Sequence, residues 1–310
     1  MYNIFMPKVQ NDSINDKPYI LTNTPAVISV LALLIFIVFG WLWWNKIYIR
    51  PRNVFEDMLK NNLATSSVTK TTKSVDGSSN ILKNEQLSFV PNIASRALLT
   101  INQPGPEGDT KVVTESIGTL TADYSQYTKI DTPQKNAEGK KLDYSKVLNQ
   151  WGKSNTESGP PQNLQQSILG LVPFARISPN ERREIIKMLI NDGAYVVDYS
   201  KVEPRKVGNK SALVFPVSIN TEKYLKTLKV LAKKGGLSDL KSLDPAQYKD
   251  NPAIKVKLVI EKSTRHLLEL DFEGSDQKET YSSYGLNTPI NVPEKSISIE
   301  ELQQKIQEIK

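Results

Sequence analysis

An unbroken apolar stretch near the N-terminus interrupts an otherwise mixed pattern of apolar and polar residues. Residues 26–44 contain no charge, and as a helix they would cover about 28 Å of a hydrocarbon core that is about 30 Å thick. Pro25 opens the stretch, where a missing backbone N–H costs nothing. The other end contains three tryptophans, at positions 41, 43 and 44, and tryptophan is enriched at membrane–water interfaces. We therefore predict a transmembrane anchor with an interfacial flank over residues 25–49, after a disordered polar tail over residues 1–24.

Two other interpretations of this stretch fit less well. A buried core helix would be shorter and amphipathic. A cleaved signal peptide would have a basic segment before a shorter apolar region and small residues at a cleavage site after it, where this chain has tryptophans. The chain has no cysteine, which excludes lipidation on cysteine as an anchor. We expect the stretch to remain as an uncleaved anchor.

The pattern becomes amphipathic and then alternating after the anchor. Apolar residues at helical spacing between Val54 and Leu63 predict a helix that begins just after Pro51 and packs on the domain. Residues 64–131 alternate with period two and are rich in Thr and Val, which predicts four or five antiparallel strands. Turn signals separate these strands at Asp76-Gly77, Pro91-Asn92 and Pro104-Gly105-Pro106.

Two amphipathic helices are recognisable by their caps. The first opens with Ser178, Pro179 and Glu181, a capping box with proline at the first helical position, and closes on Gly193. Its apolar stripe consists of Ile185, Ile186, Leu189 and Ile190. The second covers residues 221–234, and its apolar face consists of Tyr224, Leu225, Leu228 and Leu231. A shorter helix is expected over residues 144–151.

The C-terminal part returns to strands. They are predicted over residues 194–202, 211–219, 254–261, 268–273 and 277–284. The strands at residues 254–261 and 268–273 alternate regularly between apolar and polar residues, which predicts a hairpin with one apolar face and one solvent-exposed face. Ser298 and Glu301 predict a capped terminal helix that runs through Ile309.

Together these elements predict an α+β fold. An N-terminal transmembrane helix is followed by one domain over residues 50–310, in which a curved antiparallel β-sheet carries helices on its concave side. Sheet and helices then enclose an apolar volume. The pattern is compatible with a packed core and with a ligand cavity in this place.

Composition and charge narrow the choice of partners. The formal net charge is +7, but the basic residues are scattered along the chain, so no nucleic-acid interface is indicated. A basic domain next to a bilayer meets anionic head groups instead, at about 1 kcal/mol for each residue near the surface. The absence of cysteine excludes disulfides, thiol catalysis and thiolate metal sites.

Candidate catalytic chemistry is sparse. His266 is the single histidine, and it precedes a predicted strand, where a structural role is the simpler interpretation. Metal sites built on two histidines are impossible. Gly235-Gly236 follows a helix rather than opening one, so it predicts a helix cap and not a phosphate loop. We expect no enzymatic activity, no metal and no cofactor.

The order of elements at the C-terminus resembles a known family. The strand IKVKLVIEK, the strand HLLELDF, the ending Tyr281-Ser282-Ser283-Tyr284-Gly285 and the exit Thr288-Pro289-Ile290-Asn291-Val292-Pro293 resemble the close of LolA/LppX-like lipoprotein-carrier domains. The resemblance covers most of residues 53–310. The chain with its anchor also looks like membrane-anchored proteins of candidate-phylum bacteria such as Saccharibacteria.

The resemblance implies a half-barrel of antiparallel strands closed by helices, with a hydrophobic cavity that holds acyl chains or lipidated partners outside the cytoplasm. Carried over by position, the cavity would be lined by Ile185, Ile186 and Leu189 of one helix and by Leu225, Leu228 and Leu231 of the other. This chain lacks the lipidated cysteine of the lipoprotein members, and its apolar stretch replaces that anchor.

We therefore expect a single-pass protein of the cell membrane that binds lipid or a lipidated partner. The alternative is an envelope sensor or assembly subunit that binds proteins and has a filled core. The positive-inside rule compares Lys and Arg on the two sides of the apolar stretch. Two lie before it, Lys8 and Lys17, and three lie after it, Lys46, Arg50 and Arg52, so the rule favours a cytosolic domain by one residue. The resemblance instead favours an extracytoplasmic one, which we expect. No pattern in the sequence sets an oligomeric state.

Overall fold

The N-terminal part of the chain is a unit of its own. The computed structural model describes residues 24–43, 49–155, 161–236, 243–286 and 288–309. It divides the chain into residues 1–50 and residues 51–310. In the first unit α1 (Thr24–Trp43) is a helix whose described side chains are all exposed. Among the described residues, no helix combines the length and apolarity that a membrane crossing needs. Residues 1–23 of the predicted tail and residues 44–48 lie outside the described residues, whereas Thr24 is the first residue of α1. The anchor stays a prediction.

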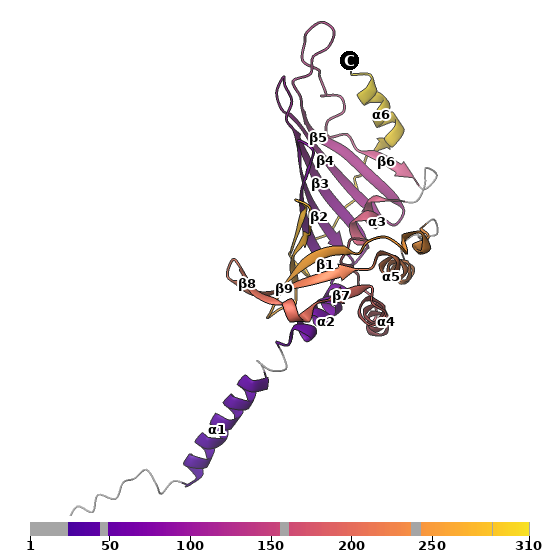
Figure 1. Cartoon of the computed structure of the whole chain (residues 1–310). Helices are drawn as coiled ribbons and strands as arrows, with labels where there is room; N and C mark the ends of the chain where they lie inside the picture. Colours follow the sequence, from indigo (N-terminus) through magenta and orange to yellow (C-terminus); the bar gives the residue numbers. More distant parts are fainter. Residues whose placement is uncertain (1–23, 44–48, 156–160, 237–242, 287, 310) are drawn as a thin grey trace, which may run out of the picture. The chain divides into compact units, whose positions relative to one another are not determined.

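The second unit is built on one large, curved and unclosed sheet (Figure 1). Its described strands are β1 (Ser67–Asp76), β2 (Ser79–Ser88), β3 (Ala94–Gln103), β4 (Thr110–Thr119), β5 (Ala122–Asp131), β6 (Gly152–Asn155), β7 (Tyr195–Val197), β8 (Glu203–Val207), β9 (Lys210–Ile219), β10 (Ile254–Glu261), β11 (Leu267–Phe272), β12 (Lys278–Ser282) and β13 (Ile297–Ser298). They follow the order β13-β6-β5-β4-β3-β2-β1-β12-β11-β10-β9-β7, and β8 also pairs with β9. Neighbours are antiparallel except β13 and β6. The α+β class is confirmed.

The first five strands form a continuous antiparallel meander, where the period-two pattern predicts four or five antiparallel strands. The three predicted turns separate β1 from β2, β2 from β3 and β3 from β4. Gly77 has a φ of 58°, a conformation that glycine adopts without steric cost. The turn between β4 and β5, at Leu120 and Thr121, carries no glycine or proline signal.

The helices of this unit lie mainly where their caps place them. They are α2 (Pro51–Asn62), α3 (Asn163–Ile168), α4 (Pro179–Ile190), α5 (Thr221–Lys234) and α6 (Ile299–Gln307). The Ser178 hydroxyl accepts from the backbone N–H of Glu181, and the Glu181 carboxylate accepts from the backbone N–H of Ser178, so the predicted capping box is confirmed. Ser298 likewise accepts from the backbone N–H of Glu301 at 3.0 Å.

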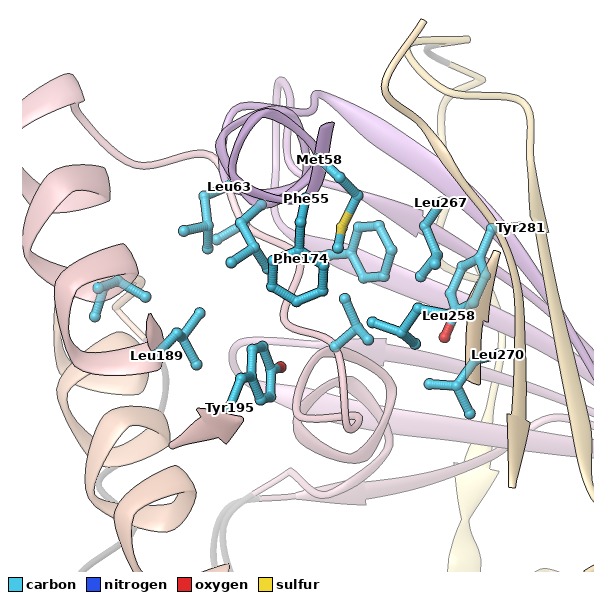
Figure 2. Close-up of a cluster of buried hydrophobic side chains, with 14 of the residues drawn as sticks. Phe55, Met58, Leu63, Phe174, Leu189, Tyr195, Leu258, Leu267, Leu270 and Tyr281 are labelled. Carbon is cyan, nitrogen blue, oxygen red and sulfur yellow. The ribbon is translucent and has the colours of Figure 1, made fainter. Parts of the chain in front are cut away.

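The main core lies between α2, α4, α5 and one face of the sheet (Figure 2). Val54, Phe55, Met58 and Leu59 of α2 are all fully buried, so the predicted packing of this helix on the domain is confirmed. The Phe55 ring centroid lies 5.6 Å from that of Phe215 in β9. α2 is therefore an integral part of the domain core.

The hairpin of β10 and β11 differs from its prediction. Its second face is not fully exposed to solvent, because Val259 and Leu268 are buried there with Ala212 in a smaller cluster. The register shifts between Val259, opposite Glu269, and Ile260, opposite Leu267. Leu268 is the extra residue of this bulge, and it turns to the outer face, where Val207 packs on the cluster.

Two local predictions are wrong. Residues 144–151 form turns instead of a helix: Asn149 adopts a φ of 58°, and its N–H donates to the carbonyl of Tyr127 in β5 at 2.8 Å. The strand predicted over residues 194–202 stops at Val197. There the Asp198 carboxylate accepts from the backbone N–H of Ser200 and starts a short 3-10 helix (Tyr199–Lys201).

Candidate ligand pocket

The six side chains predicted to contact a ligand have different surroundings in the described part of the chain. Ile185, Leu189 and Leu228 belong to the packed core, and Ile186 and Leu225 are partly buried against it. Ile186 also lines a groove between α2 and α4. Leu231, which is 1% exposed, lines an apolar pocket at the end of α5. The volume between helices and sheet is thus largely filled, and as ligand contacts the six residues stay a prediction.

The apolar pocket lies where four segments from distant parts of the sequence meet. Its volume is about 320 Å³. Its wall is formed by buried or half-buried apolar side chains from the β2–β3 connection, α3, the segment before α4 and α5, namely Phe89, Ile93, Ile168, Ala175 and Leu231. Such a wall favours an apolar ligand group, because the contact removes apolar surface from water.

Two segments of the pocket wall are held by backbone hydrogen bonds to residues 62–66, at and after the end of α2. The N–H of Ala175 donates to the carbonyl of Asn62 at 3.1 Å, and the N–H of Ile177 donates to that of Leu63 at 3.2 Å. Arg176 lies between them in a β-bridge with Ala64. The N–H of Phe89 donates to the carbonyl of Ser66 at 2.8 Å. These bonds fix the wall residues on the domain core.

The helix α3 is docked on the sheet by polar contacts and a close approach. Asp123 Oδ2 accepts from the backbone N–H of Gln162 at 2.7 Å and of Asn163 at 3.1 Å. Burial raises the pKa of the Asp123 carboxyl despite these two bonds. A Cβ on Gly118 would lie 2.3 Å from the backbone nitrogen of Leu164, so only glycine allows this contact. Ile168 is thereby placed in the pocket wall.

A buried charge cluster lies on the sheet beneath α3. The Glu85 side chain is 1% exposed, and its carboxylate pairs with Lys70 Nζ at 2.8 Å and with Lys83 Nζ at 2.5 Å. The Ser167 hydroxyl donates to the same carboxylate at 2.9 Å. Burial raises the pKa of Glu85, but the two ammonium groups outweigh it, so the pKa lies below its ordinary value. Glu85 therefore stays charged and ties α3 to β2.

The rim of the pocket is basic. Arg176 is exposed there, and Lys234 pairs with Glu184 of α4 at 3.0 Å. Gly235 caps α5 through its N–H, which donates to the carbonyl of Leu231 at 2.8 Å, so the predicted cap is confirmed. Gly236 follows with a φ of 67° and places no side chain at the rim. The rim can thus receive a negatively charged group.

The single histidine lies away from this pocket. The His266 ring stacks on that of Tyr284 with centroids 4.0 Å apart, and burial lowers the pKa of the imidazole. Among the described residues no group of three His, Cys, Asp or Glu side chains could hold a metal ion. The apolar wall of the pocket favours contact with an apolar group.

Sequence reasoning missed most of the pocket wall. Phe89, Ile93, Ile168 and Ala175 come from segments without a long periodic pattern. Ile168 belongs to an apolar stretch between connectors, and Gly235-Gly236 shows where α5 ends. Neither signal says that these segments meet.

Comparison with solved structures finds a protein of similar structure. No protein-family model and no curated protein sequence matches the chain. The structure is similar to the crystal structure of LprF from Mycobacterium bovis, with 13% sequence identity, 78% of this chain and 95% of that chain covered, and a TM-score of 0.41. The resemblances to LolA/LppX-like carriers and to Saccharibacteria proteins stay predictions.

Proposed function

We propose that the chain is a membrane-anchored, non-enzymatic protein that binds a hydrophobic ligand, a lipid or the lipid part of a partner, in the pocket at the end of α5. The observation that carries the proposal is the pocket itself: an apolar wall of Phe89, Ile93, Ile168, Ala175 and Leu231 beneath the cationic rim of Arg176 and Lys234. An acyl chain with an acidic head group has the matching polarity.

The size of the pocket limits the ligand. About 320 Å³ is at the lower end of the roughly 300–1,000 Å³ that small-molecule sites occupy. The volume suits one narrow tail better than a lipid with several chains, because the neighbouring space is filled by the core.

The proposed anchor is the apolar stretch at residues 26–44, with the domain on the outside of the cell membrane. The described side chains of α1 are exposed and, apart from Ser29, apolar, among them Phe36 at 77% and Phe39 at 68%. A helix that is hydrophobic all round needs an apolar environment. If the domain is outside, protease added to intact cells that express the chain should degrade residues 51–310; protection until the cells are lysed would contradict this placement.

Fluorescence titration with dansyl-labelled undecanoic acid tests the pocket, with the full chain held in an amphipathic polymer. We expect saturable binding that unlabelled dodecanoate displaces. Ala175→Leu and Ile93→Trp should each abolish binding by filling the pocket. Circular dichroism melts identify a variant that fails to fold, and the half-buried position of Ile93 makes its substitution the milder one.

The basic rim has a matched control on the same helix. Lys234→Ala should weaken binding of the probe about tenfold through loss of one charge-assisted contact. Lys233→Ala should leave it unchanged, because Lys233 is exposed and does not line the pocket. Absence of saturable binding, with no lipid released by organic solvent from the purified protein, would exclude the proposal and favour the protein-binding alternative with its filled core.

A further inference from the structure

A second concave site, separate from the apolar pocket, lies between α2 and α4. This groove has a volume of about 590 Å³. Five of its lining residues are basic and one is acidic: Arg52, Lys60, Arg182, Arg183, Lys187 and Glu56. No other pocket described for this domain has such an excess of one charge. The groove therefore carries an excess of positive charge.

The cations on the α2 side are already paired. Arg52 Nε lies 2.9 Å from the Glu56 carboxylate, and Lys60 Nζ lies 2.8 Å from that of Asp57. Both pairs join residues within one helix and are partly exposed, so each stabilises the fold weakly. Arg52 and Lys60 therefore add positive charge along the α2 side of the groove.

The cations on the α4 side lack an acidic partner among the described residues. Arg183 donates to the neutral side chain of Asn180, and Lys187 is exposed. Arg182 Nε is buried and has no hydrogen-bond partner in the described part of the chain. A buried donor without an acceptor costs free energy, so this atom favours an anionic oxygen that enters the groove. Ile186 and Ile190 form an apolar floor beside it.

We propose that this groove binds the phosphate-bearing head group of an anionic phospholipid in the membrane that holds α1. The inference rests on the proposed membrane anchor and not on the apolar pocket. Only residues 44–50 connect α1 to α2, and a chain of this length spans at most about 28 Å. A membrane-embedded α1 thus keeps Arg52, in the first turn of α2, within reach of the head groups. Arginine guanidinium groups match phosphate oxygens in geometry and charge.

The experiment uses the full chain in lipid nanodiscs and exploits the absence of cysteine. Asn191→Cys places one thiol for a fluorophore in the groove. The discs contain phosphatidylcholine, with or without phosphatidylglycerol, and a lipid with a spin-labelled head group as quencher. We expect stronger quenching in the discs with phosphatidylglycerol, and we expect raised salt to remove the difference.

Charge removal in the groove provides the decisive comparison. Arg182→Gln, Arg183→Gln and Lys187→Gln together should lower the docking equilibrium about a hundredfold, at about fivefold for each cation near the surface, and abolish the extra quenching. Lys206→Gln, Lys249→Gln and Lys295→Gln remove the same charge from exposed positions outside the groove and should leave the quenching unchanged.

Three results would overturn the inference: equal quenching in both kinds of disc, an equal effect of the two triple variants, or loss of the extra quenching when inorganic phosphate replaces chloride at constant ionic strength. The last would identify a site for soluble anions. Failure of the anchor itself is distinguishable, because the chain would then not enter discs at all. Failure of the apolar pocket would leave the nanodisc result unchanged.

Discussion

Glu85 shows how a single residue ties two elements together. Its carboxylate is buried between two lysines of the sheet and the Ser167 hydroxyl of α3. The pairing offsets the cost of burying each charge only while both signs are present. A buried charge cluster of this kind adds little stability compared with apolar residues in the same place. Its removal in part is costly, however, because the remaining charge is then buried without a partner.

Replacement of Glu85 by Gln should therefore destabilise the domain strongly. Lys70, with a side chain only 10% exposed, would keep a buried charge without its partner. We expect a loss of about 3 kcal/mol, which corresponds to a fall in Tm of about 6–12 °C in a thermal melt. Lys83→Gln is the control, because the more exposed Lys83 leaves the Lys70 pair intact, and its effect should stay below about 1 kcal/mol.

The same residue predicts an acid dependence. Because the folded-state pKa of Glu85 lies below the ordinary value of 4.5, its contribution to stability is present above pH 4.5 and is lost as the pH falls through the lower folded-state pKa. The Tm of the native chain should fall more steeply than that of Glu85→Gln when the pH is lowered below 4.5. Parallel curves would show that Glu85 does not contribute in this range.

His266 makes a second prediction at this scale. Burial against Tyr284 lowers the pKa of the imidazole below 6.5, so the unfolded state binds more protons as the pH falls below 6.5, and stability declines there. The chain has one histidine, so its proton NMR spectrum has a single imidazole set. The titration midpoint should lie below 6.5 in the folded chain and near 6.5 in urea; equal midpoints would contradict the burial.

At the scale of elements, the helices depend on local caps and on long-range docking to different degrees. α4 begins at the residue that its cap predicts, because a cap is a contact over three residues. α5 begins after Asn220, whose side chain accepts from the backbone N–H of Lys223, a cap that only the structure shows. α3 is six residues long and carries no side-chain cap of its own. It is held instead by Asp123 of β5 and by the close approach at Gly118 of β4.

Removal of the α4 cap should have a moderate effect. In Ser178→Ala the backbone N–H of Glu181 loses its acceptor, and we expect a loss of about 1 kcal/mol, or about 2–4 °C in Tm. Ser178→Asp, which restores an acceptor, should recover most of it. A melt unchanged by Ser178→Ala would show that the start of α4 is fixed by packing alone.

At the scale of the molecule, the fold joins α2, the first helix of the second unit, to the centre of the domain. α2 follows the proposed anchor in sequence, yet Phe55 and Met58 lie in the same cluster as Leu258 and Leu270 of the C-terminal hairpin (Figure 2). The domain therefore begins at residue 51, and α2 is not a linker.

Truncation tests this boundary. A chain that begins at residue 51 should fold and melt cooperatively, because residues 51–310 form a unit with their own core. A chain that begins at residue 63 should not, because it lacks the fully buried side chains of α2. Cooperative melting of both at one Tm would contradict the assignment of α2 to the core.

Three local features of this protein follow from its sequence alone: the apolar stretch at residues 26–44, the alternating strands within residues 64–131 and the start of α4. Each depends on contacts between residues close in sequence. Only the tertiary structure decided that Ile185 and Leu189 are core residues while Leu231 lines a pocket with Phe89 and Ile168. All of these side chains are apolar, and whether one is packed or faces a space depends on which distant segments meet there. It also decided that Leu268 turns outward, because the bulge arises from pairing across two strands.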